Sequence, residues 1–375
     1  FWESFIDNIP DHVFLSVRQI LKAAALNEIR RRATIQYERC AQTRSLVKRL
    51  TRHLTDHDRD TLLIGFARRF ATYKQAGLIF RDLQRLARLL RNPERPVTLV
   101  FAGKAHPNDV PGQAILKQVY EISLMPEFRG RVILLEDYNL SMTRELLPGV
   151  DVWLNTPKYP LEACGTSGMK AAINGVLNLS VTDGWWAEAC NGSNGWAITP
   201  HPEFEADTRE QLEAEELMNI LEYQVIPAYY ARNPEGEPEK WTCMSKASMK
   251  SILPRFNTIR MALDYLRIAY APAARESRLL SADNASAAQQ LASWKQRIDK
   301  QWSGIHGNLV SPIPASISAR ESLPVEVEVH LNGLDAGDVT VECVFGRETE
   351  TGRFDIERRL SLELAESTRG DMARY

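Results

Sequence analysis

The chain has 375 residues, with 46 Lys and Arg residues against 48 Asp and Glu residues, and a formal net charge of −2 at pH 7. This near-neutral balance argues against nucleic acid as a partner, because non-specific binding to a phosphate backbone needs a strongly basic surface. The hydrophobic content of 44% and the charged content of 25% are those of a globular protein, and the length predicts two or three domains.

No apolar run approaches the ~20 residues that cross a bilayer, so no membrane partner is expected. The five cysteines lack the C-x-x-C spacing of a zinc or redox site, and they are Cys40, Cys164, Cys190, Cys243 and Cys343. We expect free thiols in a reducing, cytoplasmic setting and no metal centre. A nucleophilic Cys164 is the minor alternative, because no histidine lies close to it in sequence. The chain begins at Phe1 without an initiator Met or signal segment, which indicates a piece of a longer protein.

Residues 1–56 are interpreted as a helical lead-in. Apolar residues recur there at helical spacing, namely Leu15, Val17, Ile20, Leu21, Ala24, Leu26, Ile29 and Ile35. Residues 57–272 then alternate between strands and helices. The predicted strands are continuously apolar and cover residues 61–67, 96–102, 131–135, 150–154 and 176–181. This pattern predicts an α/β fold with a Rossmann-like parallel sheet that helices cover on both faces.

Polar clusters follow four of these strands directly. They are Arg68-Arg69 with Lys74, Gly103-Lys104 with His106, Asp137-Tyr138, and Glu162 with Gly165 and Lys170. Ligands of open parallel sheets bind beyond the carboxyl ends of the strands, so we expect the four clusters to meet at one edge.

The segment from Leu161 to Leu177 has a carboxylate, a glycine-rich turn and a helix start in sequence. An anion cradle forms where a helix start presents free N–H groups and the positive end of the helix dipole. Glycines before the helix let the backbone approach the anion closely. This predicts phosphate binding near Gly165, Thr166 and Lys170. The competing interpretation is a tight turn with an ordinary helix cap.

The rest of the chain shows no comparable site. The Trp-rich loop Asp183–Trp196 fits core packing or stacking on sugar rings, and residues 211–233 and 240–270 are predicted helices. Residues 273–306 are expected to be a linker with a short helix around Trp294. Residues 307–375 alternate with period two, as in Val325–Leu331, and predict a small all-β, sandwich-like module.

Cations bind phosphate, a carboxylate with backbone donors suits sugar hydroxyls, and a lysine near phosphate can instead form a Schiff base with an aldehyde cofactor. The residues alone therefore indicate phosphorolysis or glycosyl transfer, without a choice between them.

Four stretches resemble the α-glucan (glycogen, starch or maltodextrin) phosphorylases, in particular their shorter bacterial branch: IGFARRFATYK, LEDYN, LEACGTSGMKAAINGVLNLSV and DGWW. The resemblance covers residues 1 to 272, and the tail after Ser281 resembles the β extension of that branch. It implies that the chain is the C-terminal half of a two-domain GT-B glycosyltransferase fold and depends on pyridoxal 5'-phosphate.

The resemblance also implies roles for single residues. Lys170 would carry the cofactor as a Schiff base, Thr166 and Gly165 would hold its phosphate with Arg68, and Tyr138 would lie against its ring. Arg69 and Lys74 would bind orthophosphate, and Glu162 with the backbone of Cys164 and Gly165 would bind glucose hydroxyls of the α-glucan. The cofactor phosphate would exchange a proton with orthophosphate. The orthophosphate would protonate the glycosidic oxygen, which leaves, and would attack the sugar with retention.

Two positions depart from the family pattern, since Cys164 stands where Ser is usual and Asn139 where longer members carry Arg. The N-terminal domain that completes the sugar site is missing, so the isolated chain is expected to have little activity. Homo-oligomerisation stays open. Two alternatives are open. One is a glycosyltransferase of the glycogen-synthase type, which is disfavoured because Lys170 stands where those enzymes carry a second Glu. The other is a non-catalytic glucan-binding fragment.

Overall fold

The computed structural model describes residues 2–40, 42–310, 312–314, 316–318, 322–348, 354–367 and 370–375. The chain divides into two compact units, Phe1–Ala262 and Leu263–Tyr375. The finer domain bounds at residues 56, 272 and 306 stay predictions.

The first unit is built on six parallel strands. They are β1 (Leu62–Ala67), β2 (Val97–Ala102), β3 (Val132–Leu135), β4 (Val152–Asn155), β5 (Leu177–Val181) and β6 (Gly195–Ile198). Their order in the sheet is β3-β2-β1-β4-β5-β6, which is the Rossmann order, and every neighbouring pair is parallel. The predicted α/β class and the five predicted strands are confirmed. The short edge strand β6 was not predicted.

Helices cover both faces of this sheet. The longer ones are α2 (Asp11–Arg39), α3 (Arg44–Leu50), α4 (Leu83–Leu90), α5 (Val110–Leu124), α6 (Leu140–Gly149), α7 (Thr166–Ile173), α9 (Ala206–Ile220) and α11 (Glu239–Ile252). Shorter ones are α1 (Trp2–Asp7), α8 (Trp185–Ala189) and α10 (Ile226–Tyr230). Within the described residues, no helix has both the length and the apolar character that a bilayer crossing requires.

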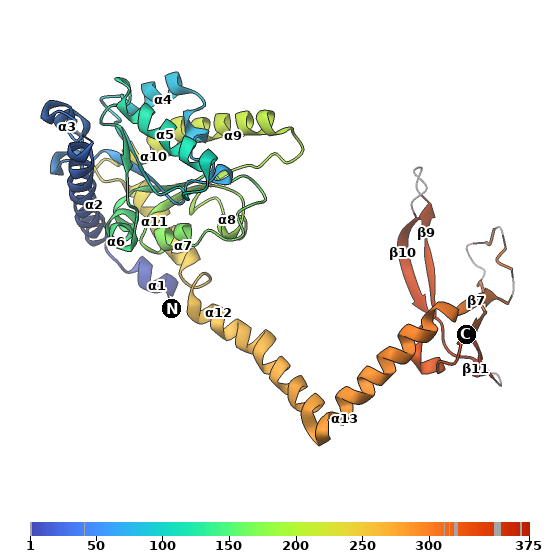
Figure 1. Cartoon of the computed structure of the whole chain (residues 1–375). Coiled ribbons are helices and arrows are strands. Elements are labelled where there is room, and N and C mark those ends of the chain that lie inside the picture. Colours follow the sequence, from blue (N-terminus) through green and yellow to red (C-terminus); the bar gives the residue numbers. More distant parts are fainter. Residues whose placement is uncertain are drawn as a thin grey trace. The chain divides into compact units, whose positions relative to one another are not determined.

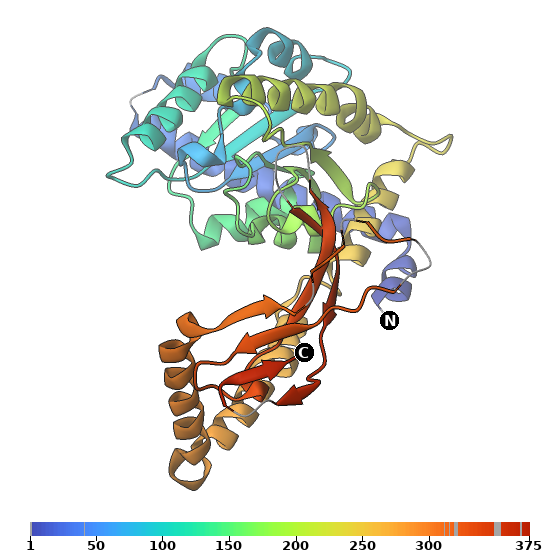
Figure 2. The ribbon, with the colours of Figure 1, turned by 90° about the vertical axis from the view of Figure 1, so that its right-hand side faces the viewer.

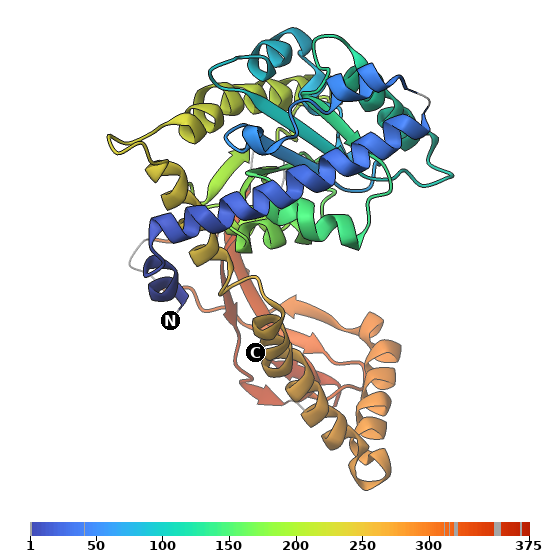
Figure 3. The same cartoon turned by 90° about the vertical axis from the view of Figure 1, so that its left-hand side faces the viewer.

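Alternate residues of each strand feed two separate cores. In β1, Leu62, Ile64 and Phe66 join a core with α4, α5, α9 and α10, whereas Leu63 and Ala67 join a core with α2, α3 and α6. Figure 2 shows α9 on one face of the sheet, and Figure 3 shows α2 running across the opposite face. Because both faces are covered, the edge of the sheet is where polar groups can gather.

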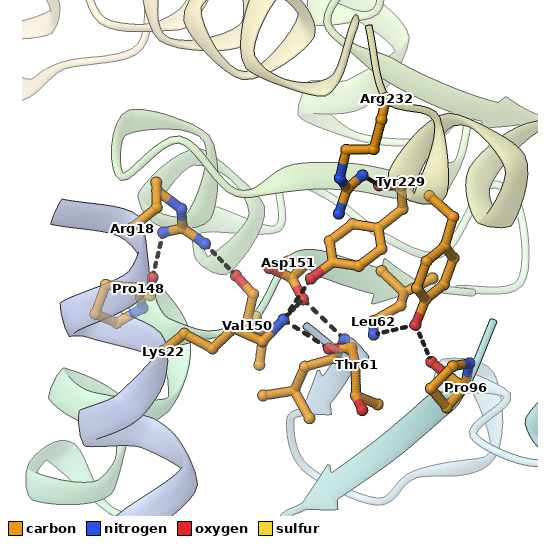
Figure 4. A network of polar contacts seen from close by, with 12 residues as sticks. Arg18, Lys22, Thr61, Leu62, Pro96, Pro148, Val150, Asp151, Tyr229 and Arg232 are labelled. Carbon is orange, nitrogen blue, oxygen red and sulfur yellow. Dashed lines mark hydrogen bonds and ion pairs between the residues drawn. The ribbon is translucent and has the colours of Figure 1, made fainter. Parts of the chain in front are cut away.

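A buried polar network fixes α2 to the amino-terminal edge of the sheet (Figure 4). Lys22 Nζ donates to Asp151 Oδ2 at 2.5 Å, to the Thr61 carbonyl at 2.6 Å and to the Tyr229 hydroxyl at 2.6 Å. Asp151 Oδ2 also accepts from the Leu63 N–H at 2.8 Å. Burial lowers the pKa of Lys22, and the Asp151 carboxylate opposes this shift. All three donors of the ammonium are therefore satisfied away from water.

The second unit combines helices with antiparallel strands. Its elements include the end of α12 (Thr258–Tyr265), α13 (Ala271–Gln301), β7 (His306–Leu309), β8 (Val327–His330), β9 (Glu342–Glu348), β10 (Phe354–Ser361), β11 (Glu366–Ser367) and β12 (Met372–Arg374) (Figure 1). One sheet has the order β11-β12-β8-β7, and β9 and β10 form a separate pair. The predicted β structure in the C-terminal part of the chain is confirmed, and its sandwich-like arrangement stays a prediction. Helix α13 is longer than the short helix expected around Trp294, and residues 282–285 interrupt it with non-helical angles.

Candidate active site

The first cationic residues of the site are placed by a pairing that continues beyond β1 and β2. The Arg68 N–H donates to the Ala102 carbonyl at 3.0 Å, and the Phe70 N–H donates to the Lys104 carbonyl at 2.9 Å. A Cβ at Gly103 would lie 2.1 Å from the Arg68 carbonyl oxygen, so only glycine permits this approach. The backbone of Arg68 is thereby fixed at the carboxyl edge of the sheet.

The turn that carries Lys74 is tied to the loop after β4. The Lys158 N–H donates to the Tyr73 carbonyl at 2.7 Å, and the Thr156 hydroxyl donates to the Gln75 carbonyl at 3.1 Å. Because β1 and β4 are neighbours in the sheet, these bonds join the Lys74 turn to the segment that leads to Glu162.

Glu162 is the centre of a buried charge cluster, which we define as Arg68, Lys74 and Glu162. Glu162 Oε2 lies 3.2 Å from Arg68 Nη2 and also accepts from Lys74 Nζ. Each of the three side chains is no more than 10% exposed. The structure therefore brings together residues from two strand ends, as the sequence predicted, and leaves the cluster with one positive charge in excess.

Burial and neighbouring charges shift the pKa values of Arg68 in the cluster and of Tyr73 beside it. Burial lowers the pKa of Arg68, and the Glu162 carboxylate opposes part of that shift. Partial burial raises the pKa of Tyr73, but interactions with Lys74 and Arg69 outweigh it, so the pKa is lowered overall. Lys74 Nζ also lies 4.4 Å from the centre of the Tyr73 ring. Exposed Arg69 and buried Lys74 thus both interact with the Tyr73 hydroxyl.

The glycine-rich loop leads directly into α7. Gly165, with φ of 93°, is the cap residue of α7, and no side chain caps the helix there. A Cβ at Gly168 would lie 2.7 Å from both Asn178 Oδ1 and the Trp185 ring, so this glycine allows α7 to pack closely. Thr166 and Lys170, four positions apart on one helix face, are exposed.

Not every predicted residue joins the cluster. Among the residues that the structure describes, no hydrogen bond or ion pair links the side chain of Thr166, Lys170 or Tyr138 to it. Lys104 instead pairs with Asp137 at 2.7 Å on the exposed part of the same edge. The roles of these residues stay predictions.

Cys164 is exposed beside the cluster. Its pKa is raised by partial burial and by the negative charges of Glu162 and Glu188. A raised pKa keeps the thiol protonated at neutral pH, which disfavours the nucleophile alternative.

Comparison with known proteins decides the family. The family described as carbohydrate phosphorylase matches residues 15–192, a range that contains every predicted site residue. The maltodextrin phosphorylase of Thermococcus litoralis is 42% identical over 362 residues, which is 96% of this chain and 41% of the relative. The glycogen phosphorylase of Aquifex aeolicus is 49% identical over 219 residues, or 58% of this chain and 31% of the relative. The glycogen phosphorylase of Mycobacterium bovis is 40% identical over 321 residues, which is 84% of this chain and 37% of the relative.

Residues 15–192 of the chain belong to the carbohydrate phosphorylase family. The chain spans between 31% and 41% of the length of these curated relatives. The activity, substrates and partners of the whole protein are therefore matters for proposal.

Asp183 is a further residue of this site. In the sequence it stands out only as the first residue of the DGWW stretch, and no role was predicted for it. Its buried carboxylate accepts from the Glu162 N–H at 2.9 Å through Oδ2 and from the Gly184 N–H at 2.8 Å through Oδ1. The sequence feature that could have indicated Asp183 is its position two residues after the end of β5, at the same edge as the other polar clusters. Asp183 fixes the backbone of Glu162 and leaves its side chain to interact with the cations.

Proposed function

We propose that this chain is the C-terminal half of an α-1,4-glucan phosphorylase, which uses orthophosphate to release glucose 1-phosphate from glycogen or maltodextrin with retention. The observation that carries the proposal is the meeting of Glu162 with Arg68 and Lys74 at the ends of β1 and β4. A buried site with excess positive charge suits a phosphate, and a carboxylate beside it suits sugar hydroxyls. One edge of the sheet thus offers chemistry for both reactants.

The residues also fit pyridoxal 5'-phosphate. Arg68 Nη1 is buried and has no hydrogen-bond partner among the described residues, which suits an incoming phosphate oxygen. The start of α7 adds free N–H groups and the positive end of the helix dipole. Lys170 would hold the cofactor through its amine, Thr166, Gly165 and Arg68 would hold its phosphate, and Tyr138 would lie along its ring. Burial raises the pKa of Tyr138, so its hydroxyl remains a hydrogen-bond donor.

When bound, the cofactor supplies a phosphate group that exchanges a proton with the substrate phosphate. In this proposal Arg69 and Lys74 bind and orient orthophosphate and neutralise its charge. Glu162 and the backbone of Cys164 and Gly165 orient the glucose unit of the α-glucan. The chain contributes positioning and electrostatic stabilisation. The rest of a GT-B fold, beyond this chain, would close the sugar site in a cytoplasmic enzyme.

Cofactor uptake tests the proposal. The chain is incubated with pyridoxal 5'-phosphate, desalted and examined by absorption spectroscopy in the near-ultraviolet and visible range. We expect a protein-bound band that Lys170→Ala abolishes and that Lys240→Ala, at an exposed lysine near the start of α11, retains. A band of equal strength in Lys170→Ala would contradict the proposed role of Lys170.

A further inference from the structure

Glu162 occupies the position that an anionic ligand of the cations would take. Its Oε2 accepts from Lys74 Nζ and lies 3.2 Å from Arg68 Nη2, so one carboxylate oxygen serves both cations. Under the proposed function these donors would serve phosphate oxygens, Arg68 those of the cofactor and Lys74 those of orthophosphate. A buried cation without a counter-ion is costly, and Glu162 provides that counter-ion from within the chain.

The carboxylate and a phosphate would compete for this position. Both are anions that accept charge-assisted hydrogen bonds, and two anions in a water-poor site repel each other strongly. Arg68 has a second buried nitrogen, Nη1, without a partner among the described residues. The guanidinium can therefore bind an arriving anion before it gives up Glu162.

The backbone of Glu162 is held by contacts that do not involve its side chain. Asp183 holds the Glu162 N–H, and a Cβ at Gly184 would lie 2.7 Å from the Glu162 carbonyl oxygen. Exchange would then involve rotation about side-chain bonds of Glu162 and no rearrangement of its loop.

We propose that Glu162 is an internal counter-ion that keeps the Arg68–Lys74 site closed until a phosphate exchanges with it. The displaced carboxylate becomes free to accept hydrogen bonds from a sugar, a step that rests on the proposed function. Phosphate and sugar would then favour each other's binding, and this coupling is reciprocal.

The test is a titration of this chain with inorganic phosphate at fixed ionic strength, followed by calorimetry. Glu162→Gln removes the competing charge, and we expect it to bind phosphate about tenfold more tightly than the unmodified chain, the effect of about 1.4 kcal/mol. Glu162→Asp keeps the charge but is one methylene shorter, so it loses contact with the cations and is expected to bind more tightly as well. Glu188→Gln, at an exposed position of α8, controls for charge acting at a distance.

Several results would overturn the inference. They are equal affinities for Glu162→Asp and the unmodified chain, equal gains for Glu162→Gln and Glu188→Gln, or no phosphate binding by any of the proteins. If Glu162→Gln does not fold, the phosphate affinity of Glu162→Asp decides.

A second readout is thermal stability, where phosphate should raise the Tm of Glu162→Gln more than that of the unmodified chain. Uptake of pyridoxal 5'-phosphate at Lys170 is measured separately, so loss of this inference and loss of the proposed function give different results.

Discussion

Arg68, Lys74 and Glu162 have side chains no more than 10% exposed, and their surroundings hold them in that position. Asp183 and Gly184 fix the loop, and the sheet edge supplies the burial. The residue types and their positions after strands were readable from the sequence. The pairing of Glu162 with both cations was not, because it depends on side-chain directions that spacing does not encode.

Replacing Asp183 tests its positioning role. Asp183→Ala leaves the N–H groups of Glu162 and Gly184 without their acceptor, and a buried unpaired donor costs about 1–3 kcal/mol. We expect the free energy of unfolding, measured by urea denaturation, to fall by about 2 kcal/mol or more. Asp207→Ala, at an exposed position in the first turn of α9, should change it by only a few tenths of a kcal/mol. Equal effects of the two variants would show that Asp183 does not fix the loop.

His53 predicts a pH dependence of stability. Burial and the positive charges of Arg131 and Arg52 lower its pKa to about 4, below the value of about 6.5 in an unfolded chain. Between these values the unfolded state binds more protons, so stability falls as pH decreases through this window, by at most about 1.4 kcal/mol per pH unit. His53→Gln should flatten the slope between pH 6.5 and 4, whereas His57→Gln, at an exposed position, should keep it. An unchanged slope in His53→Gln would contradict the account.

At the scale of elements, the strands were predictable because five of them are continuous apolar runs in a sheet buried on both faces. Strand β6 escaped prediction because its four residues follow a Gly- and Asn-rich loop and include no long apolar run. In α2, Leu26 and Ile29 are buried as expected, but Val17, Ile20 and Ile35 are exposed. The helix instead buries Lys22, whose partner Asp151 is far away in sequence.

The Lys22–Asp151 pair predicts a strong dependence on both partners. Lys22→Met leaves Asp151 as a buried uncompensated charge and should lower the free energy of unfolding by about 3–5 kcal/mol. Adding Asp151→Asn removes that charge, so the double variant should be more stable than Lys22→Met alone. Lys48→Met, at an exposed position of α3, is the control. Additive effects in urea denaturation would indicate that the two residues do not interact.

The packing of α7 depends on Gly168. Gly168→Ala places a methyl group within 2.7 Å of Trp185 and Asn178 atoms, so α7 must shift. Overpacking of this kind costs about 1–3 kcal/mol, and we also expect weaker uptake of pyridoxal 5'-phosphate. Gly337→Ala meets nothing within 4 Å and should leave both properties unchanged. Full stability and uptake in Gly168→Ala would show that the close approach is not required.

At the scale of the whole molecule, the chain carries the Arg68, Lys74 and Glu162 cluster at one edge of the sheet, and it spans about two fifths or less of the length of its relatives. The sequence predicted the α/β fold through apolar runs and the C-terminal β structure through alternation. It did not predict the length of α13, whose residues after the break at 282–285 include many good helix formers such as Ala, Gln and Lys.

The isolated chain should produce glucose 1-phosphate no faster than its own Lys170→Ala variant when supplied with maltodextrin, orthophosphate and pyridoxal 5'-phosphate. The reason is that the proposed N-terminal part, which would close the sugar site, lies outside this chain. A coupled assay for glucose 1-phosphate measures this directly. Robust turnover by the isolated chain would show that the site is complete without further domains.

The most direct test of the central claim is to locate the cofactor on the chain. The protein is incubated with pyridoxal 5'-phosphate, reduced with borohydride, digested and mapped by peptide mass spectrometry. The account predicts one dominant modified residue, Lys170, at an excess of cofactor too small to label the exposed lysines Lys48, Lys117 and Lys240. Absence of label, or label spread equally over those lysines and Lys170, would contradict it.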